Sequence, residues 1–241
     1  MRLDKFLSET GTLSRSESGR AVRAGKVLVN GCAAKSPSDR VDPERDEIVY
    51  GGERICYRRF TYILLNKPDG YVSATEDGRE KTVLDLLPEK LQKLSLFPCG
   101  RLDKHTLGLM LLTNDGQLAH DLLSPRHHVE KNYRFSVKFP LTDEEVATLE
   151  QGTVLEDGYE TKPSRIRLDD DRKSGTIMLI EGKYHQIKRM MESVHNQITA
   201  LERISFGPLT LDPTMPRGEF RYLTEAEEAA LQALRRGTPK Q

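Results

Sequence analysis

The chain has 241 residues, of which 37% are hydrophobic, and it carries 37 basic and 37 acidic side chains. This length can bury one sizeable core and a small additional module, and the balanced charge alone neither favours nor excludes a nucleic-acid partner. No apolar run approaches the roughly 18–20 residues that cross a bilayer, and the charged start MRLDK is unlike a signal-peptide core. We therefore expect a soluble, cytoplasmic protein without a membrane partner, and because nothing in the sequence requires a dimer, a monomer.

The cysteines and histidines argue against a metal site. The three cysteines are far apart, odd in number and never arranged as C-x-x-C, which predicts buried thiols in a reducing compartment: Cys32, Cys56 and Cys99. The three histidines within residues 120–128 have no acidic or cysteine partner at a recognised ligand spacing. We predict no metal ion.

Two short helices are predicted at the start of the chain. Residues 3–7 place three apolar side chains on one helical face. Ser14 and Glu17 form a capping-box pattern that opens a second helix, and this helix is expected to end near Gly25.

Hairpin-like strands follow these helices. The run VLVNG at 27–31 contains Asn-Gly, the preferred sequence of a tight hairpin turn, and DEIVY at 46–50 reads as a later strand. Charge is uneven here: residues 1–35 hold seven Lys/Arg against three Asp/Glu, whereas 36–53 hold two against six. The order of elements resembles the S4 RNA-binding domain, over about residues 1–50. Four basic side chains would then contact phosphates, although a solvated helix face is an alternative: Arg15, Arg20, Arg23 and Lys26.

A polar stretch at 51–60 separates this module from a larger α+β region, so we predict domains at 1–58 and 59–241. Strand-like runs are expected at 61–65, 109–113, 133–139 and 176–181. Helical runs are expected at 81–87, 115–123, 142–151 and 185–194, with capping boxes at Thr142–Glu145 and Thr224–Glu227.

One carboxylate stands out within GRLDKHTLGLMLLTNDG at 100–116. Asp103 is placed on a turn that leads directly into an apolar run typical of a buried strand. A capped turn or a surface ion pair would explain this aspartate equally well, so Asp103 alone does not indicate catalysis.

Two other segments bring aromatic and cationic residues, SPRHHVEKNYRF at 124–135 and EGKYHQIKRM at 181–190. Tyr133 could be a core aromatic, with Phe135 and Phe139 continuing the same face of a strand. The cations of the second segment could be solvated or could hold RNA phosphates at a helix start. Four residues with helical spacing predict core packing there: Ile187, Met190, Met191 and Val194.

Together with LLNKPDGYVS at 64–73, these motifs resemble the pseudouridine synthases in both content and order. With the S4-like module in front, the chain is most similar to the ribosomal small-subunit synthase A branch. The resemblance implies a catalytic domain with a mixed, mainly antiparallel sheet and flanking helices. It also implies that Asp103 is the essential catalytic aspartate, that Tyr133 packs on the target base and assists deprotonation, and that Lys188 pairs with Asp103.

The expected RNA-binding residues come from both parts of the chain. Beyond the S4-like module, Arg101 is expected to orient the Asp103 loop and to face RNA, and four further residues are expected to contact it: Arg126, His185, Gln186 and Arg189.

The implied reaction converts a uridine of 16S ribosomal RNA, conventionally numbered 516, to pseudouridine. The carboxylate acts as nucleophile or stabilises charge on the sugar, the target nucleotide is flipped out of its stack, and no cofactor is needed because there is no net oxidation or hydrolysis. Two alternatives stay open: a synthase acting on 23S ribosomal RNA, and a non-catalytic RNA-binding factor in ribosome assembly. The ribosomal RNA partner could be naked or part of an assembling ribonucleoprotein.

Overall fold

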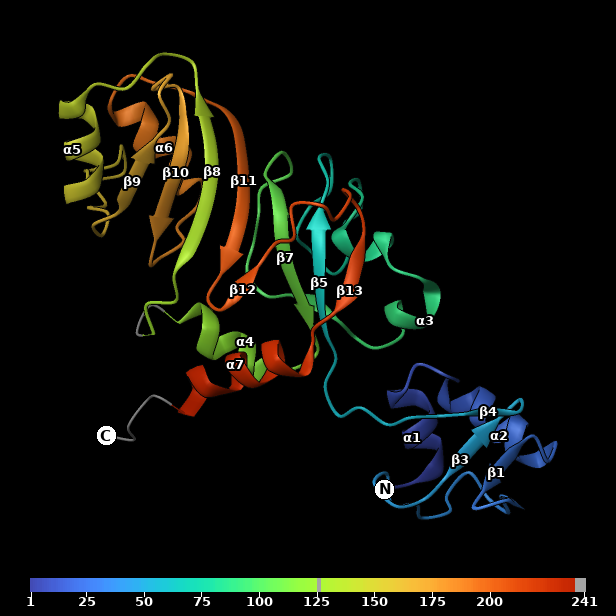
Figure 1. The fold of residues 1–241 in the computed structure, drawn as a ribbon. Helices are drawn as coiled ribbons and strands as arrows, with labels where there is room; N and C mark the ends of the chain where they lie inside the picture. Colours follow the sequence, from blue (N-terminus) through green and yellow to red (C-terminus); the bar gives the residue numbers. More distant parts are fainter. Residues whose placement is uncertain (125–126, 237–241) are drawn as a thin grey trace. The chain divides into compact units, whose positions relative to one another are not determined.

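The computed structural model describes residues 1–124 and 127–236, and the chain forms two units (Figure 1). The first unit is built from Met1–Thr61 together with Leu87–Phe97, and the second from Tyr62–Leu86 and the chain from Pro98 onward. The boundary between residues 58 and 59 stays a prediction of where two folding domains separate.

The first unit begins with two short helices, α1 (Leu3–Glu9) and α2 (Arg15–Arg23). The predicted capping box of α2 is confirmed. The Ser14 hydroxyl accepts a hydrogen bond from the Glu17 N–H, and the Glu17 carboxylate accepts one from the Ser14 N–H. These bonds satisfy backbone donors that have no partner inside the helix, so they fix where α2 begins.

A four-stranded antiparallel sheet completes this unit, with the order β2-β1-β3-β4. Its strands are β1 (Val27–Val29), β2 (Cys32–Ala33), β3 (Ile48–Tyr50) and β4 (Glu53–Arg54), and the short helix α3 (Glu89–Gln92) belongs to the same unit. The predicted hairpin turn is confirmed, because Asn30 and Gly31 have φ angles of 51° and 79°, the left-handed values that such a turn requires.

The prediction of three buried thiols is wrong for two of them. Cys99 is buried, and burial raises the pKa of its thiol to about 12, whereas Cys32 and Cys56 are exposed. Cys32 lies in β2, a two-residue strand at the edge of its sheet, and Cys56 follows β4. No sequence pattern separates these cases, because cysteine burial depends on which tertiary neighbours cover the residue.

The second unit is built on a nine-stranded sheet with the order β13-β5-β7-β11-β8-β10-β9, to which β6 and β12 attach at β7 and β11. β7 pairs with β11 in parallel, whereas β5–β7, β8–β11, β8–β10, β9–β10 and β5–β13 are antiparallel. The predicted mixed, mainly antiparallel sheet is therefore confirmed. The strands are β5 (Tyr62–Lys67), β6 (Phe97–Pro98), β7 (Leu107–Thr113), β8 (Lys131–Val137), β9 (Arg165–Leu168), β10 (Ser174–Leu179), β11 (Ile198–Phe206), β12 (Leu209–Thr210) and β13 (Phe220–Tyr222).

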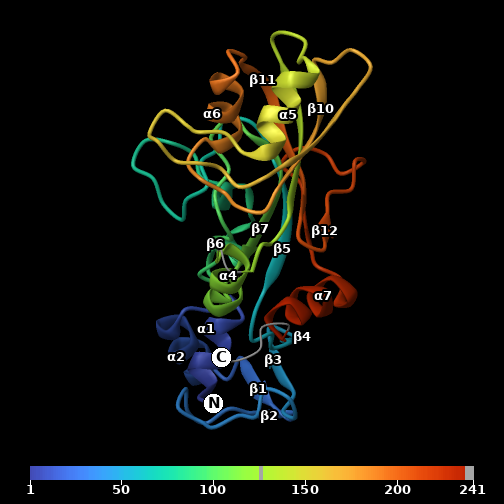
Figure 2. The same ribbon diagram turned by 90° about the vertical axis from the view of Figure 1, so that its left-hand side faces the viewer.

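Helices flank this sheet in two groups (Figures 1 and 2). α5 (Asp143–Gln151) and α6 (Gln186–Ser193) accompany the part formed by β8 to β11, and α4 (Gly116–Leu123) lies beside α7 (Glu225–Arg236). The predicted capping boxes at the starts of α5 and α7 are present. The helix predicted over 81–87 is instead a short 3-10 helix at Val83–Leu86.

Gly108 lets β7 and β11 approach closely next to the Asp103 loop. Its φ is 97°, and a Cβ at this position would lie 2.3 Å from the carbonyl oxygen of Arg203. Only glycine fits here without displacing the neighbouring strand. Arg203 in β11 pairs with Gly108 of β7 on one side and with Tyr133 of β8 on the other. The register therefore places these three residues side by side on adjacent strands.

β8 alternates between buried and more exposed side chains along its length. Tyr133 and Phe135 are buried, at 8% and 1% exposed, but Phe139 lies beyond the end of β8 and is 52% exposed. The alternative in which all three aromatic residues share one core face therefore does not hold for Phe139.

Candidate active site

Asp103 lies in the loop between β6 and β7, and this loop is tied to Ser73. The Ser73 hydroxyl donates to the carbonyl oxygen of Leu102 at 2.7 Å, and the Leu102 N–H donates back to the Ser73 hydroxyl at 3.0 Å. The Thr106 N–H donates to the carbonyl oxygen of Asp103 at 3.0 Å and closes a turn. The backbone on both sides of Asp103 is therefore fixed by the protein itself.

Lys67, the last residue of β5, holds the same loop from inside the protein. Its side chain is fully buried, and its ammonium donates to the carbonyl oxygens of Pro68, Lys104 and Thr106 at 3.1, 3.0 and 2.9 Å. Because an ammonium has three N–H donors, all of them are satisfied. Burial lowers the pKa of Lys67 to about 8, although two nearby carboxylates oppose this effect.

Raising the pH from 8 to 10 is expected to stabilise the wild type relative to a Lys67→Met variant. The pKa of Lys67 is about 8 in the folded protein and 10.5 ordinarily. Between these values the unfolded chain binds the extra proton, so the free energy of unfolding rises with pH. Methionine carries no such proton, and the two slopes should differ by up to about 1.4 kcal/mol per pH unit. Denaturant unfolding of both proteins across this range measures the difference. Equal slopes would mean that Lys67 titrates normally when folded.

Lys188, on α6, forms an ion pair with Asp103 across 85 positions of sequence. Its Nζ lies 2.7 Å from Asp103 Oδ2, and Nε2 of His185 lies 3.4 Å from Asp103 Oδ1. The side chains of Asp103 and Lys188 are both partly buried, at 26% and 29% exposed. The two opposite charges attract each other in this partly desolvated setting and hold the carboxylate in place.

The turn that begins α6 is held by a buried carboxylate, Glu181. The Gln186 side chain donates to Glu181 at 2.6 Å and accepts a hydrogen bond from the Lys183 N–H at 2.9 Å, while the Tyr159 hydroxyl donates to Glu181 at 2.7 Å. His185 stands at the turn with a left-handed φ of 50°. These contacts fix the direction in which α6 leaves and hence the position of Lys188.

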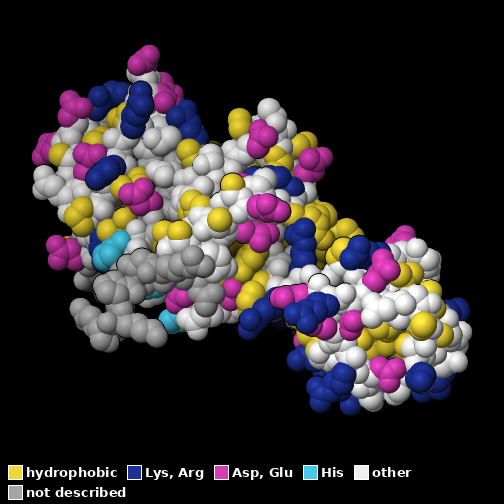
Figure 3. All heavy atoms as spheres, turned by 60° about the horizontal axis from the view of Figure 1, so that its bottom comes forward, with side chains coloured by type: hydrophobic (Ala, Val, Ile, Leu, Met, Phe, Trp, Pro, Cys, Tyr) yellow, Lys and Arg dark blue, Asp and Glu magenta, His cyan; other side chains and the backbone are white. Residues whose placement is uncertain are grey.

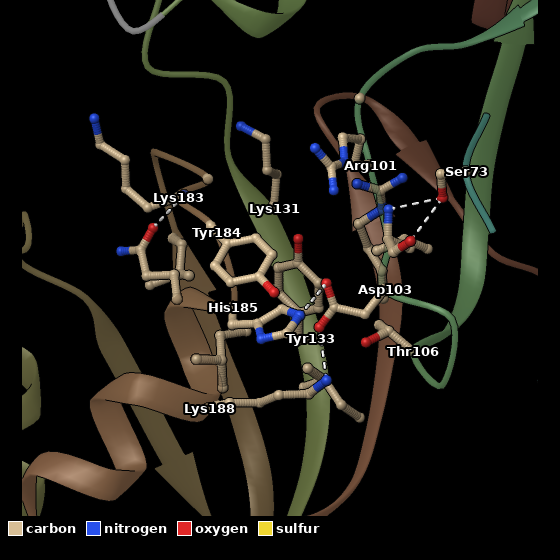
Figure 4. Close-up of a pocket in the computed structure, with 18 of the residues that line it drawn as sticks. Ser73, Arg101, Asp103, Thr106, Lys131, Tyr133, Lys183, Tyr184, His185 and Lys188 are labelled. Atoms are coloured by element: carbon tan, nitrogen blue, oxygen red, sulfur yellow. Dashed lines mark hydrogen bonds and ion pairs between the residues drawn. The ribbon is translucent and has the colours of Figure 1, made fainter.

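A cavity of about 510 Å³ opens beside Asp103 (Figure 4). Asp103, Tyr133 and Lys188 line it together, and they come from a loop, from β8 and from α6. Tyr133 is almost fully buried at the cavity wall. The structure thus brings the three predicted catalytic residues to one cavity.

Two buried cations line the same cavity, and sequence reasoning missed them both. Lys131 is 7% and Arg203 is 2% exposed. Within the described part of the chain, they donate to backbone carbonyl oxygens, of Val129 at 2.8 Å and of Leu109 at 2.8 Å, and neither pairs with a carboxylate. Burial lowers the pKa of Lys131 to about 8, and the charge of Arg203 adds to this shift. Buried like charges are costly, so this part of the cavity favours an anionic group. For Arg203 the available signal was a charged residue within a largely apolar strand, whereas Lys131, the first residue of β8, gave no such signal.

The predicted RNA-binding residues of the second unit differ in where they lie. Arg101 is exposed and lines the cavity, as does the partly buried His185. Gln186 also lines it, but its amide is engaged by the α6 turn. Arg189 pairs with Asp157 at 2.6 Å and does not line the cavity.

The remaining predicted RNA-binding residues lie outside the cavity. Arg15, Arg20, Arg23 and Lys26 are all exposed, on or directly after α2, and lysine and arginine side chains stand on the visible face of the first unit in Figure 3. Arg126 lies outside the described residues.

Two other kinds of site are absent from the described ranges. Over residues 1–124 and 127–236, no helix is both long and apolar enough to span a bilayer. In the same ranges, no three side chains among His, Cys, Asp and Glu are grouped so that they could hold a metal ion.

Comparison with known proteins decides the family. Residues 61–193, which contain Asp103, Tyr133 and Lys188, match the model of the RNA pseudouridylate synthase family, and residues 1–48 match that of the S4 domain. The chain is an RNA pseudouridylate synthase. The resemblance of the first part to the S4 domain and of the second to the pseudouridine synthases is therefore confirmed.

Relatives of this synthase match it over nearly its whole length. A Bacillus subtilis (strain 168) protein named as an uncharacterized RNA pseudouridine synthase, YtzG, is 46% identical over 94% of this chain and 96% of its own. The ribosomal small subunit pseudouridine synthase A of Escherichia coli (strain K12) is 37% identical over 96% of this chain and 100% of its own. A crystal structure of a pseudouridylate synthase, 36% identical, superimposes with a TM-score of 0.68 over 96% of this chain and 99% of that one.

Proposed function

We propose that this synthase converts one uridine of small-subunit (16S) ribosomal RNA to pseudouridine, and that the target is the uridine conventionally numbered 516. The observation that carries the proposal is the Asp103–Lys188 ion pair, which stands on the wall of a cavity beside Tyr133. The choice of RNA is supported by the full-length similarity to proteins named ribosomal small subunit pseudouridine synthase A. A ribosomal RNA substrate places the enzyme in the cytoplasm.

The proposed reaction begins when the target nucleotide leaves its stack and its uracil enters the cavity. Asp103 attacks C1′ of the ribose, or stabilises positive charge there, while the bond from C1′ to uracil N1 breaks and uracil takes the electron pair. Uracil then turns, and its C5 bonds to C1′ and displaces the carboxylate. C5 loses its proton and N1 gains one, so no atom or electron is gained or lost overall.

Five side chains have roles in this scheme. Asp103 is the nucleophile, and Lys188 holds its carboxylate through the 2.7 Å contact. Tyr133 presents its ring to the uracil from the cavity wall and assists removal of the C5 proton. The buried charges of Lys131 and Arg203 favour the anionic uracil that exists between bond breaking and bond making.

The exposed basic residues of the first unit would contact RNA phosphates in this function: Arg15, Arg20, Arg23 and Lys26. Replacing Arg20 and Arg23 by glutamine is expected to weaken RNA binding and to flatten its salt dependence. Each lost phosphate contact should reduce the slope of log K against log salt by about 0.7–0.9. Arg45→Gln is the control, because Arg45 is also exposed but lies near Asp42. An unchanged slope in the double variant would remove these two residues from the RNA interface.

Pseudouridine mapping of ribosomal RNA from cells that lack the protein tests the proposed function. We expect one mark to disappear, at position 516 of 16S RNA, and to return when the wild-type protein is restored. Loss of a mark in 23S RNA instead would favour the large-subunit alternative. An unchanged map with defective subunit assembly would favour a binding factor, and would overturn the proposal.

A further inference from the structure

Tyr184 is an exposed aromatic residue at the cavity that holds Asp103. Its side chain is 68% exposed, the largest value among the exposed large hydrophobic side chains of the described residues, and it lines the cavity together with Asp103 and Tyr133. A single exposed aromatic residue needs no explanation by itself. Its setting beside the catalytic carboxylate is what points to a ligand.

The Tyr184 ring has one covered face and a defined orientation. It stacks on the imidazole of His185, with ring centroids 3.8 Å apart and an angle of 17° between the planes. His185 in turn lies 3.4 Å from Asp103, and Figure 4 shows the Tyr184 ring over His185 and next to the Asp103 carboxylate. No other aromatic ring among the described residues stacks on Tyr184, and with 68% of the side chain exposed the ring can accept a second planar partner.

The backbone that carries Tyr184 is also held. The Gln186 N–H donates to the carbonyl oxygen of Lys183 at 3.2 Å, and the Lys183 N–H donates to the Gln186 side chain at 2.9 Å. Arg189 reaches the carbonyl oxygen of Tyr184 at 3.4 Å. A planar ring on a fixed turn loses little freedom when a second ring stacks on it, which favours binding.

We propose that Tyr184 stacks with a nucleobase adjacent to the target uridine in the RNA chain. The inference rests on the proposed function. When the target base is flipped out, its neighbours lose a stacking partner. An aromatic side chain at the cavity can replace that partner, whichever base the neighbour carries. Tyr133, 8% exposed, is placed for the target base, whereas Tyr184 is exposed enough to meet a base that stays outside.

The charges near Tyr184 suit this ligand. Lys183 precedes it and is exposed, and Arg101 is exposed on the same cavity. Two cations flanking an aromatic ring match the alternation of phosphate and base in a single-stranded RNA. A neutral apolar ligand would not need them.

The test compares Tyr184→Leu with wild type on an RNA that contains the target uridine. We expect kcat/KM to fall by about 5- to 100-fold, mainly through a higher KM, and Tyr184→Phe to behave as wild type because stacking needs only the ring. Phe139→Leu is the matched control, since it removes a 52% exposed ring that does not line the cavity.

An RNA that lacks the stacked base separates stacking from a structural role. On substrates with an abasic nucleotide immediately 5′ or 3′ of the target, the loss caused by Tyr184→Leu should vanish for one of the two. An equal loss on both abasic substrates would mean that Tyr184 acts only by supporting His185, and would overturn the proposal.

Binding measurements keep this inference distinct from the proposed function. If the wild type forms no pseudouridine in small-subunit RNA, the proposed function fails. Stacking can still be measured in that case. The dissociation constants of the intact and abasic RNAs are compared for wild type and Tyr184→Leu. If the effects of the variant and of the missing base are additive at both neighbours, Tyr184 stacks on neither base, and the proposal is rejected.

Discussion

The Asp103→Asn enzyme is expected to bind its RNA with near wild-type affinity and to form pseudouridine at least about 10³-fold more slowly. Asparagine has nearly the same shape but no negative charge, so it can neither attack C1′ nor stabilise positive charge on the sugar. It also leaves the ammonium of Lys188 without the carboxylate that lies 2.7 Å away. Single-turnover pseudouridine formation and equilibrium RNA binding measure the two effects separately.

The control for this substitution is Asp69→Asn. Asp69 is a neighbouring but exposed aspartate that pairs with His105 at 2.8 Å and does not line the cavity. It undergoes the same chemical change, so we expect its turnover to stay close to wild type. Retained turnover in Asp103→Asn, with the thermal unfolding of both variants unchanged, would remove Asp103 from the mechanism.

Removing the cation from position 188 should give the second-largest loss. We expect Lys188→Met to lower the single-turnover rate by about 10²–10³-fold, comparable to the loss of one preorganised electrostatic partner in other enzymes. Lys188→Arg keeps the positive charge and should recover a large part of the rate. RNA affinity should change little, because Lys188 is engaged with Asp103 rather than with solvent.

Lys183→Met is the matched control for this experiment. It removes a positive charge from the same segment, but Lys183 is exposed and its ammonium lies over the Tyr159 ring at 4.4 Å. We expect it to affect RNA affinity and salt dependence more than the chemical rate. Equal rates for Lys188→Met and wild type would show that the ion pair is structural.

The three residues proposed as catalytic could be singled out because their sequence surroundings are distinctive. Asp103 stands before an apolar run that becomes β7, and Tyr133 and Lys188 occur in motifs that follow in a fixed order. Periodicity alone left a core role open for Tyr133 and a surface role for Asp103. The structure places both on one cavity.

The parts that sequence reasoning missed depend on tertiary contacts. β11 was not predicted, because Glu202 and Arg203 interrupt its apolar pattern, and the 2% exposure of Arg203 follows only from packing between β7 and β8. Gln186 was expected at the RNA surface and is instead buried in the α6 turn. Whether polar residues such as these are buried depends on what packs around them, so the sequence pattern alone does not place them.

The loop of Asp103 is fastened on one side by Ser73 and on the other by Lys67. Because the loop already holds the carboxylate in place, we expect the main conformational change to be in the RNA, where the target nucleotide has to leave its stack. The rate should then follow how easily the target opens.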